Sequence, residues 1–133
     1  MRENEPKSEQ KRAARMILDK KFDHPSAPLL KHLEWLPFIQ RCKYHTAILV
    51  FKSLNAMSPI YMKNILTTKE SFYNLRSTND IIHPLMKSRF TKNTFQYSAM
   101  NVWNDIPSDI KNTKKLCTFR VKYRNYLLQN VSQ

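Results

Sequence analysis

The sequence contains no glycine. Glycine is the residue that adopts positive backbone φ angles without steric cost and lets a backbone approach a ligand closely. Average usage would give about nine glycines in a chain of this length. Their absence argues against phosphate-cradling loops, dinucleotide-binding fingerprints and nucleophile elbows, because each of these motifs requires glycine. Helix ends must then use Asn in the left-handed position, and we expect Asn55 to take that position after the central helix.

The central helix is predicted from Pro37 to Leu54. Pro37 suits the first turn of a helix, where its missing N–H has no intrahelical partner to lose, and no second proline follows until Pro59. Residues 47–51 are all apolar, which predicts burial on nearly every side of the helix, including at Leu49. The chain around this helix is expected to pack upon it.

One polar strip runs along the same predicted helix. Arg41, His45 and Lys52 fall within about 40° of each other on a helical wheel. A cationic strip on an otherwise apolar helix suits contact with a polyanion. The alternative is the solvated edge of an ordinary core helix.

The other helical patterns predict an all-α fold, a small bundle of about five to six helices. The expected helices span 8–20, 27–34, 59–66, 91–105 and 114–128, with an irregular connector over about 67–90 that includes one short strand near Asp80–Ile82. The last helix has the clearest apolar stripe: Leu116, Phe119, Tyr123, Tyr126 and Leu127. We expect Trp35, Trp103, Phe119 and Tyr126 to pack the core, with residues 1–7 a disordered tail and residues 8–130 a single domain.

The charge is strongly positive and unevenly distributed. The 133-residue chain has a formal net charge of +13, and no acidic residue follows Asp109, whereas six basic residues do. Such a balance indicates a phosphate-rich partner, either nucleic acid or an anionic membrane surface. The membrane is disfavoured because no predicted helix pairs a wide apolar face with a free basic face. A generic solubilising surface is the remaining alternative.

Catalytic and metal chemistry find little support in the sequence. None of the acidic residues forms a plausible pair for the two metals that a polymerase or nuclease needs. Cys42 and His45 are a close Cys–His pair, but they lie on different sides of the predicted helix, so no zinc site is expected. Cys42 and Cys117 suit reduced core residues of an intracellular protein, in nucleus or cytoplasm, although a disulfide between them stays open. We expect no enzyme activity, no cofactor and no small-molecule substrate.

Several segments, in order, resemble the region that follows the reverse transcriptase domain in non-LTR (LINE-like) retrotransposon polyproteins. They are Gln10-Lys11-Arg12-Ala13-Ala14-Arg15 with Ile17-Leu18, Pro25-Ser26-Ala27-Pro28-Leu29, Trp35-Leu36-Pro37 with Arg41 and His45, Val50-Phe51-Lys52-Ser53-Leu54-Asn55, Pro59-x-Tyr61, Arg76-Ser77, Phe95-x-Tyr97-Ser98, Trp103-Asn104-x-Ile106-Pro107 and Phe119-Arg120-x-x-Tyr123-x-x-Tyr126-Leu127. The resemblance covers about residues 10 to 128. Two positions depart from the family pattern: Ala56 and Ala99 stand where the family tends to have glycine.

The resemblance implies a helical thumb-to-tail piece of an RNA-directed DNA polymerase, separated from its catalytic domains. Those missing domains would be possible partners in trans. In the parent polymerase, this region would lie near the template–primer duplex and hold its backbone by charge. The sequence therefore predicts nonspecific binding to RNA or DNA backbone through Arg12, Arg15, Arg41, Lys52, Arg120 and Arg124. The alternative is a helical protein-interaction domain, or an inert relic of a degenerate element copy.

Overall fold

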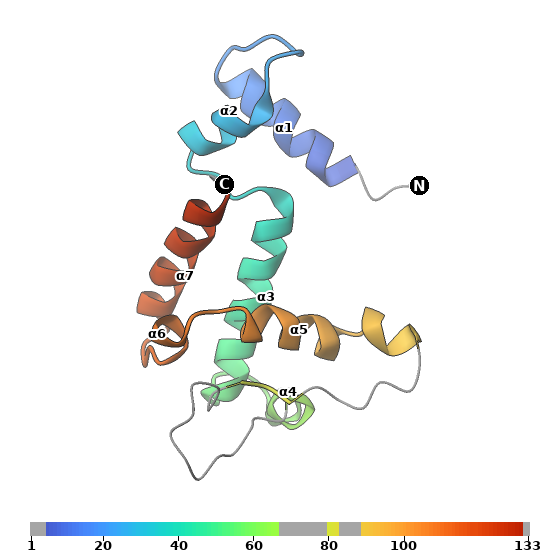
Figure 1. Cartoon of the computed structure of the whole chain (residues 1–133), viewed down its shortest axis with the longest axis vertical. Helices are drawn as coiled ribbons and strands as arrows, with labels where there is room; N and C mark the ends of the chain where they lie inside the picture. The colour runs from blue at the N-terminus through green and yellow to red at the C-terminus, as the bar shows by residue number, and fades with distance from the viewer. Residues whose placement is uncertain (1–4, 67–79, 83–88, 132–133) are drawn as a thin grey trace. The chain divides into compact units, whose positions relative to one another are not determined.

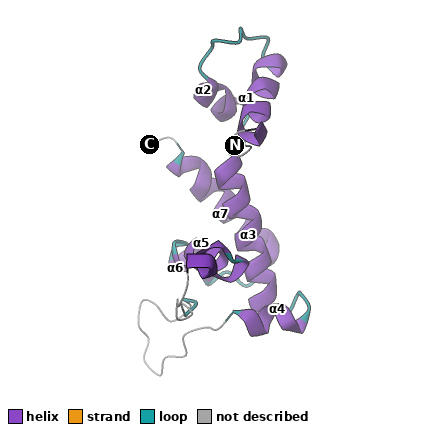
Figure 2. Cartoon of the chain, turned by 90° about the vertical axis from the view of Figure 1, so that its right-hand side faces the viewer, coloured by secondary structure: helices purple, strands orange, loops and turns teal. Residues whose placement is uncertain are grey.

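The computed structural model describes residues 5–66, 80–82 and 89–131, and in these ranges the chain is helices joined by turns (Figures 1 and 2). The elements are α1 (Glu5–Ile17), α2 (Ser26–His32), α3 (Phe38–Leu54), α4 (Ile60–Ile65), the 3₁₀-helix η1 (Arg89–Asn93), α5 (Phe95–Asn104), α6 (Ser108–Lys111) and α7 (Leu116–Asn130). No strand occurs among the described residues; Ile81 forms an isolated β-bridge where a short strand was expected. The predicted all-α fold is confirmed.

The predicted start of the first helix differs from the structure. Helix α1 begins at Glu5, before the expected start at Ser8, so residues 5–7 belong to a helix rather than to a disordered tail. Residues 1–4 lie outside the described residues, as do 67–79 and 83–88 of the expected connector. The connector therefore stays a prediction over those two stretches.

Prolines mark where the helices start. Pro25, Pro59 and Pro107 each immediately precede a helix, with φ between −59° and −55° and ψ between 132° and 145°. Pro37 precedes α3, and its carbonyl accepts the N–H of Arg41 at 2.9 Å. A proline here loses no helical hydrogen bond, because its ring lies outside the intrahelical ladder. The sequence placed Pro37 in the first turn, and the structure places it one residue earlier.

Three helix ends use the left-handed conformation without glycine. Asp19, Glu34 and Ala56 have φ of 49°, 53° and 55°. After each of them the next backbone N–H bonds back into the last helical turn: Lys20 to Arg15, Trp35 to Leu30, and Met57 to Lys52, at 2.8 to 2.9 Å. This is the Schellman pattern. The expectation for Asn55 was wrong by one residue, since Ala56 takes the left-handed position after α3. The Asn55 side chain donates to the Phe51 carbonyl at 2.8 Å.

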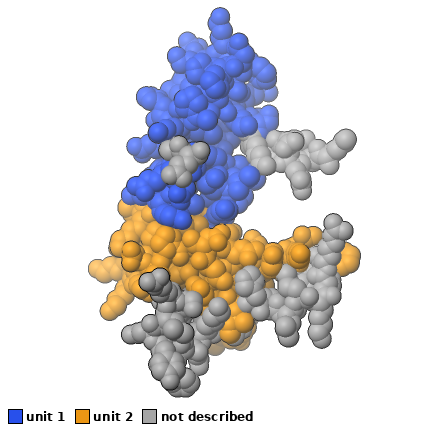
Figure 3. Space-filling model, viewed as in Figure 1, with its two compact units in different colours: residues 1–43, 124–133 blue, residues 44–123 orange. Residues whose placement is uncertain are grey.

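The chain forms two compact units (Figure 3). Unit 1 comprises residues 1–43 and 124–133, and unit 2 comprises residues 44–123. The chain passes between the units inside α3 and inside α7, so each of these helices contributes residues to both. The single domain expected over residues 8–130 stays a prediction.

Unit 1 has a small core supplemented by polar contacts. Ala14, Leu29 and Leu30 are buried, and Leu18, Leu33 and Trp35 pack against them. The Gln10 side chain donates from Nε2 to the Leu36 carbonyl at 2.7 Å. Trp35 therefore packs where α1 and α2 meet, apart from the other tryptophan, Trp103, which lies in unit 2.

Unit 2 is built around stacked aromatic rings. Phe119 of α7 is fully buried, and its ring lies 4.5 Å from that of Phe51 in α3 and 5.9 Å from that of Trp103 in α5. Tyr123 continues the stack at 5.8 Å, one turn further along α7. The stripe predicted on the last helix is confirmed at Phe119, Tyr123 and Leu127, which are all buried. These aromatic contacts join three helices that are distant in sequence.

Two burial predictions were wrong. Leu49 is 37 % exposed, so α3 is not buried on every side, although Ala47, Ile48, Val50 and Phe51 are buried. Five successive residues of an α-helix point in five directions, and the direction of Leu49 is only partly covered. The two cysteines are exposed free thiols rather than core residues.

Candidate nucleic-acid interface

The six residues predicted to contact phosphate are divided between the two units. Four belong to unit 1 and two to unit 2: Arg12, Arg15, Arg41 and Arg124 in the first, Lys52 and Arg120 in the second. Exposure separates them further, since Arg12, Arg41, Arg120 and Arg124 are exposed while Arg15 and Lys52 are half-buried.

Arg15 is partly occupied by a structural contact. Its Nε donates to the His24 carbonyl at 3.0 Å, and its guanidinium lies 5.4 Å from the centre of the Phe22 ring. Both contacts are to the turn between α1 and α2. An arginine has five N–H donors, so some capacity for phosphate remains. Its first role in the structure is nevertheless to hold that turn.

Arg124 also makes a contact within unit 1. Its Nη2 donates to the Glu34 carbonyl at 3.0 Å. Glu34 is the left-handed residue that follows α2, so the contact joins the end of α2 to α7. The contact fixes where the guanidinium lies while its side chain stays exposed.

Arg12 and Arg41 are exposed cations of α1 and α3. Acidic residues of unit 1 are interspersed with such cations in the sequence, among them Glu9, Asp19 and Glu34, which are exposed as well. Mixed signs on one surface weaken the attraction for a polyanion, because each carboxylate repels phosphate. The basic character of unit 1 is therefore diluted.

The last part of unit 2 has unmixed charge. Its exposed cations are Lys114, Lys115, Arg120 and Lys122. No acidic residue follows Asp109 in the sequence. Helix α7 buries Phe119 and Tyr123, which fixes the helix, whereas Arg120 and Lys122 of the same helix are exposed. This stretch is the best candidate for contact with a nucleic-acid backbone, and we call it the basic segment (residues 114–122).

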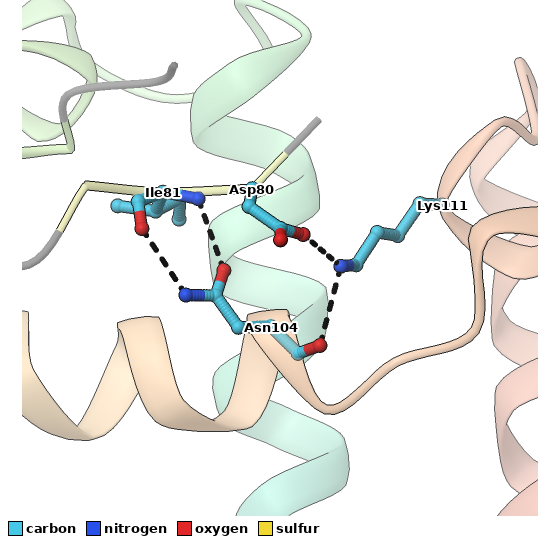
Figure 4. Close-up of polar contacts among 4 residues, drawn as sticks. All are labelled: Asp80, Ile81, Asn104 and Lys111. Carbon is cyan, nitrogen blue, oxygen red and sulfur yellow. Dashed lines mark hydrogen bonds and ion pairs between the residues drawn. The ribbon is translucent and has the colours of Figure 1, made fainter. Parts of the chain in front are cut away.

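Lys111 does not belong to that surface, although the sequence counted it among the six basic residues after Asp109. Its Nζ donates to the Asp80 carboxylate at 2.6 Å and to the Asn104 carbonyl at 3.4 Å (Figure 4). Its side chain is only 5 % exposed. The charge is thus neutralised inside unit 2.

Asn104 completes the same polar cluster. Its side-chain amide donates to the Ile81 carbonyl at 3.1 Å and accepts the Ile81 N–H at 3.0 Å, so it pairs with that residue as a neighbouring strand would (Figure 4). Ile81 itself is fully buried. The cluster holds Asp80–Ile82 against α5 and α6. Sequence reasoning missed this role, and its one signal was the Trp103-Asn104-x-Ile106-Pro107 segment.

Metal ligands are not grouped in the described ranges. No set of three or more His, Cys, Asp or Glu side chains lies close enough there to hold an ion. His45 is exposed, and its ring meets that of Tyr44 edge-on at 5.5 Å. That contact joins neighbouring residues of α3.

A cavity in unit 1 was missed by sequence reasoning. It has a volume of about 510 Å³ and lies between α2 with the turn after it and the end of α7. Trp35 and Leu128 line it together with Lys31 and Arg124. No sequence signal could have located it, because its walls come from residues about 90 positions apart.

None of the helices in the described part of the chain is long and apolar enough to cross a lipid bilayer. Comparison of the chain with protein-family models, with curated proteins and with solved structures finds no match.

Proposed function

We propose that the chain is a non-catalytic helical module that binds the backbone of RNA or DNA with little sequence preference, in the nucleus or the cytoplasm. We further propose, from the resemblance given above, that it derives from the region after the reverse transcriptase domain of a non-LTR retrotransposon. The missing polymerase domains would then be its protein partners in trans. The observation that carries the binding proposal is the basic segment, where four exposed cations occur with no acidic residue.

The physical basis is counterion release. Phosphates along a nucleic acid hold condensed cations, and lysine or arginine side chains that replace them release those cations into solution. Such contacts position a protein on the backbone without reading the bases. The exposed cations of the basic segment suit this mode, because their side chains are in solvent and are long enough to reach phosphates at different positions along a backbone.

The test is the salt dependence of binding to duplex DNA. If each of the four exposed cations of the basic segment neutralises about one phosphate, log K should fall with log salt at a slope of about −4. Replacing both Arg120 and Lys122 by Gln should reduce the magnitude of the slope by about 2. The matched control replaces Thr118 and Val121 by Gln. Both residues are exposed on the same helix and carry no charge. An unchanged slope in the charge variant would move the contact surface away from the basic segment.

A second candidate function is protein interaction through unit 1. Met16, Ile17 and Phe22 are 75 %, 58 % and 82 % exposed, which is unusual for large apolar side chains close together in sequence. Failure of the wild-type protein to bind nucleic acid at about 50 mM salt would favour this candidate. Magnesium-dependent primer extension by the purified chain would contradict the non-catalytic proposal.

A further inference from the structure

The cavity in unit 1 combines an apolar wall with cations. Pro28 and Trp35 line it from the side of α2, and Leu128 lines it from α7. Lys31 of α2 and Arg124 of α7 also line it, so its two cations come from segments that are distant in sequence. Its volume of about 510 Å³ falls within the usual range for small-ligand sites, about 300 to 1,000 Å³. The cavity can therefore hold one small aromatic group with a charged substituent.

Trp35 is a fixed part of the wall. Its backbone N–H donates to the Leu30 carbonyl at 2.8 Å, as part of the α2 end. Its side chain packs against the buried cluster of Ala14, Leu29 and Leu30, and it is half-buried. Trp35 therefore packs against the core and is also one of the residues that line the cavity. An aromatic surface held in this way stacks with a planar ring without having to be ordered first.

The cations select for an anion. The guanidinium of Arg124 is oriented by its bond to the Glu34 carbonyl, which leaves other N–H groups for a ligand. Lys31 adds a second positive charge from the last turn of α2. The carboxylate of Glu34 also lines the cavity, so the charge of these three side chains is positive by one. Asn125 and Gln129 offer amides that can donate or accept at a base edge.

From this juxtaposition, and resting on the proposed function above, we infer that the cavity takes one unpaired nucleotide. The base packs on Trp35, and its phosphate is held by Lys31 and Arg124. A base inside a duplex is covered on both faces by its neighbours, so only a single-stranded or extruded base can use an aromatic wall. The inference assigns to unit 1 a contact with single strands that differs from the backbone contact of the basic segment.

Tryptophan fluorescence tests the inference directly. The full-length protein is titrated with a ten-residue single strand of thymidine or of uridine, and with an abasic strand of the same length. The base-bearing strands should quench emission and bind about 5- to 150-fold more tightly than the abasic strand, which keeps the phosphates but has nothing to stack. The thymidine and uridine arms show whether DNA or RNA is the better source of the nucleotide.

Two sets of variants locate the effect. Trp35→Phe should abolish the quenching while Trp103, which is 2 % exposed in unit 2, continues to emit. Lys31→Gln should weaken binding of the base-bearing strand several-fold more than Lys11→Gln, which removes the same charge from an exposed position on α1. Thermal unfolding of each variant shows that unit 1 is intact.

The outcomes separate this inference from the proposed function. Equal affinity for abasic and base-bearing strands, without quenching, would overturn the nucleotide inference and leave backbone binding intact. No binding to any strand or duplex would overturn both. Quenching of Trp35 by an acidic peptide at the same concentration as by the oligonucleotide would also overturn the inference, because the cavity would then accept an anion without a base.

Discussion

The core of unit 1 and the core of unit 2 are built from different kinds of contact. Unit 2 buries large side chains against one another, with Phe119 stacked on Phe51 and Trp103. The buried cluster of unit 1 consists of one alanine and two leucines, and several of its polar side chains donate to backbone carbonyls. Burial of an aromatic side chain stabilises a fold by several kcal/mol, whereas one hydrogen bond contributes about 1 kcal/mol net. We therefore expect unit 2 to be the more stable unit.

The difference also bears on function. A unit with a small core can leave a cavity beside its tryptophan, whereas the tryptophan of unit 2 is closed in by its neighbours. Arg15 and Arg124 of unit 1 use some of their N–H donors on backbone carbonyls. The side chains of the cations in the basic segment are exposed to solvent, where a partner can reach them. The unit with the stronger core thus carries the simpler binding surface.

The largest expected effect is that of Phe119→Ala, which removes the centre of the aromatic stack. The free energy of unfolding should fall by about 3–5 kcal/mol. Leu30→Ala in unit 1 should cost about 2 kcal/mol, at the low end for a buried leucine, since its cluster is small and can relax around the cavity. Denaturant unfolding checks both, with Trp35 and Trp103 as fluorescent reporters of units 1 and 2. Equal losses would contradict the proposed difference between the cores.

The next effect concerns the polar cluster of unit 2. Asn104→Ala leaves the N–H and carbonyl of the buried Ile81 without their partner, which should cost about 1–3 kcal/mol. The Ile81 amide should then exchange its proton much faster in hydrogen-exchange measurements. Asn93→Ala, at an exposed position, serves as the control. If both variants lose the same stability, the cluster does not hold Asp80–Ile82.

A smaller effect, of opposite sign, is expected at a helix end. Ala56→Gly should raise the free energy of unfolding by about 0.5–1 kcal/mol, because Ala56 has a positive φ that glycine adopts without a Cβ clash. Glu34→Gly makes the corresponding change in unit 1 and should act in the same direction. The matched control is Ala13→Gly inside α1, where the same exchange should lower stability by a similar amount. Destabilisation by Ala56→Gly would contradict the left-handed assignment.

The smallest expected effect is that of Leu49→Ala. Leu49 is 37 % exposed, so its truncation should change the free energy of unfolding by less than about 1 kcal/mol. Ile48→Ala, one residue earlier and buried, should cost about 2–5 kcal/mol. Chemical denaturation of the two variants under the same conditions compares them. A large loss at Leu49 would restore the expectation that α3 is buried on all sides.

The sequence by itself determined that the chain is helical and where several of its helices begin to within a residue or two. Prolines stand before α2, α3, α4 and α6, and the apolar stripe of α7 follows the helical period. These features depend on local backbone preferences and on the spacing of side chains along one helix, and both can be read from a single segment. The left-handed residue after α3 was misplaced by one position: local preference favours Asn55, but the Asn55 N–H still bonds to the Phe51 carbonyl in the helical pattern, and Ala56 takes the positive φ.

Only the tertiary structure decided which side chains of these helices meet other parts of the chain. Arg15 and Arg124 donate to carbonyls of other segments, Lys111 pairs with Asp80, and the cysteines are exposed. The cavity beside Trp35 likewise joins residues from α2 and α7. Helical periodicity predicts that two residues share a face. It does not predict what that face contacts, because the contacting residues come from segments distant in sequence.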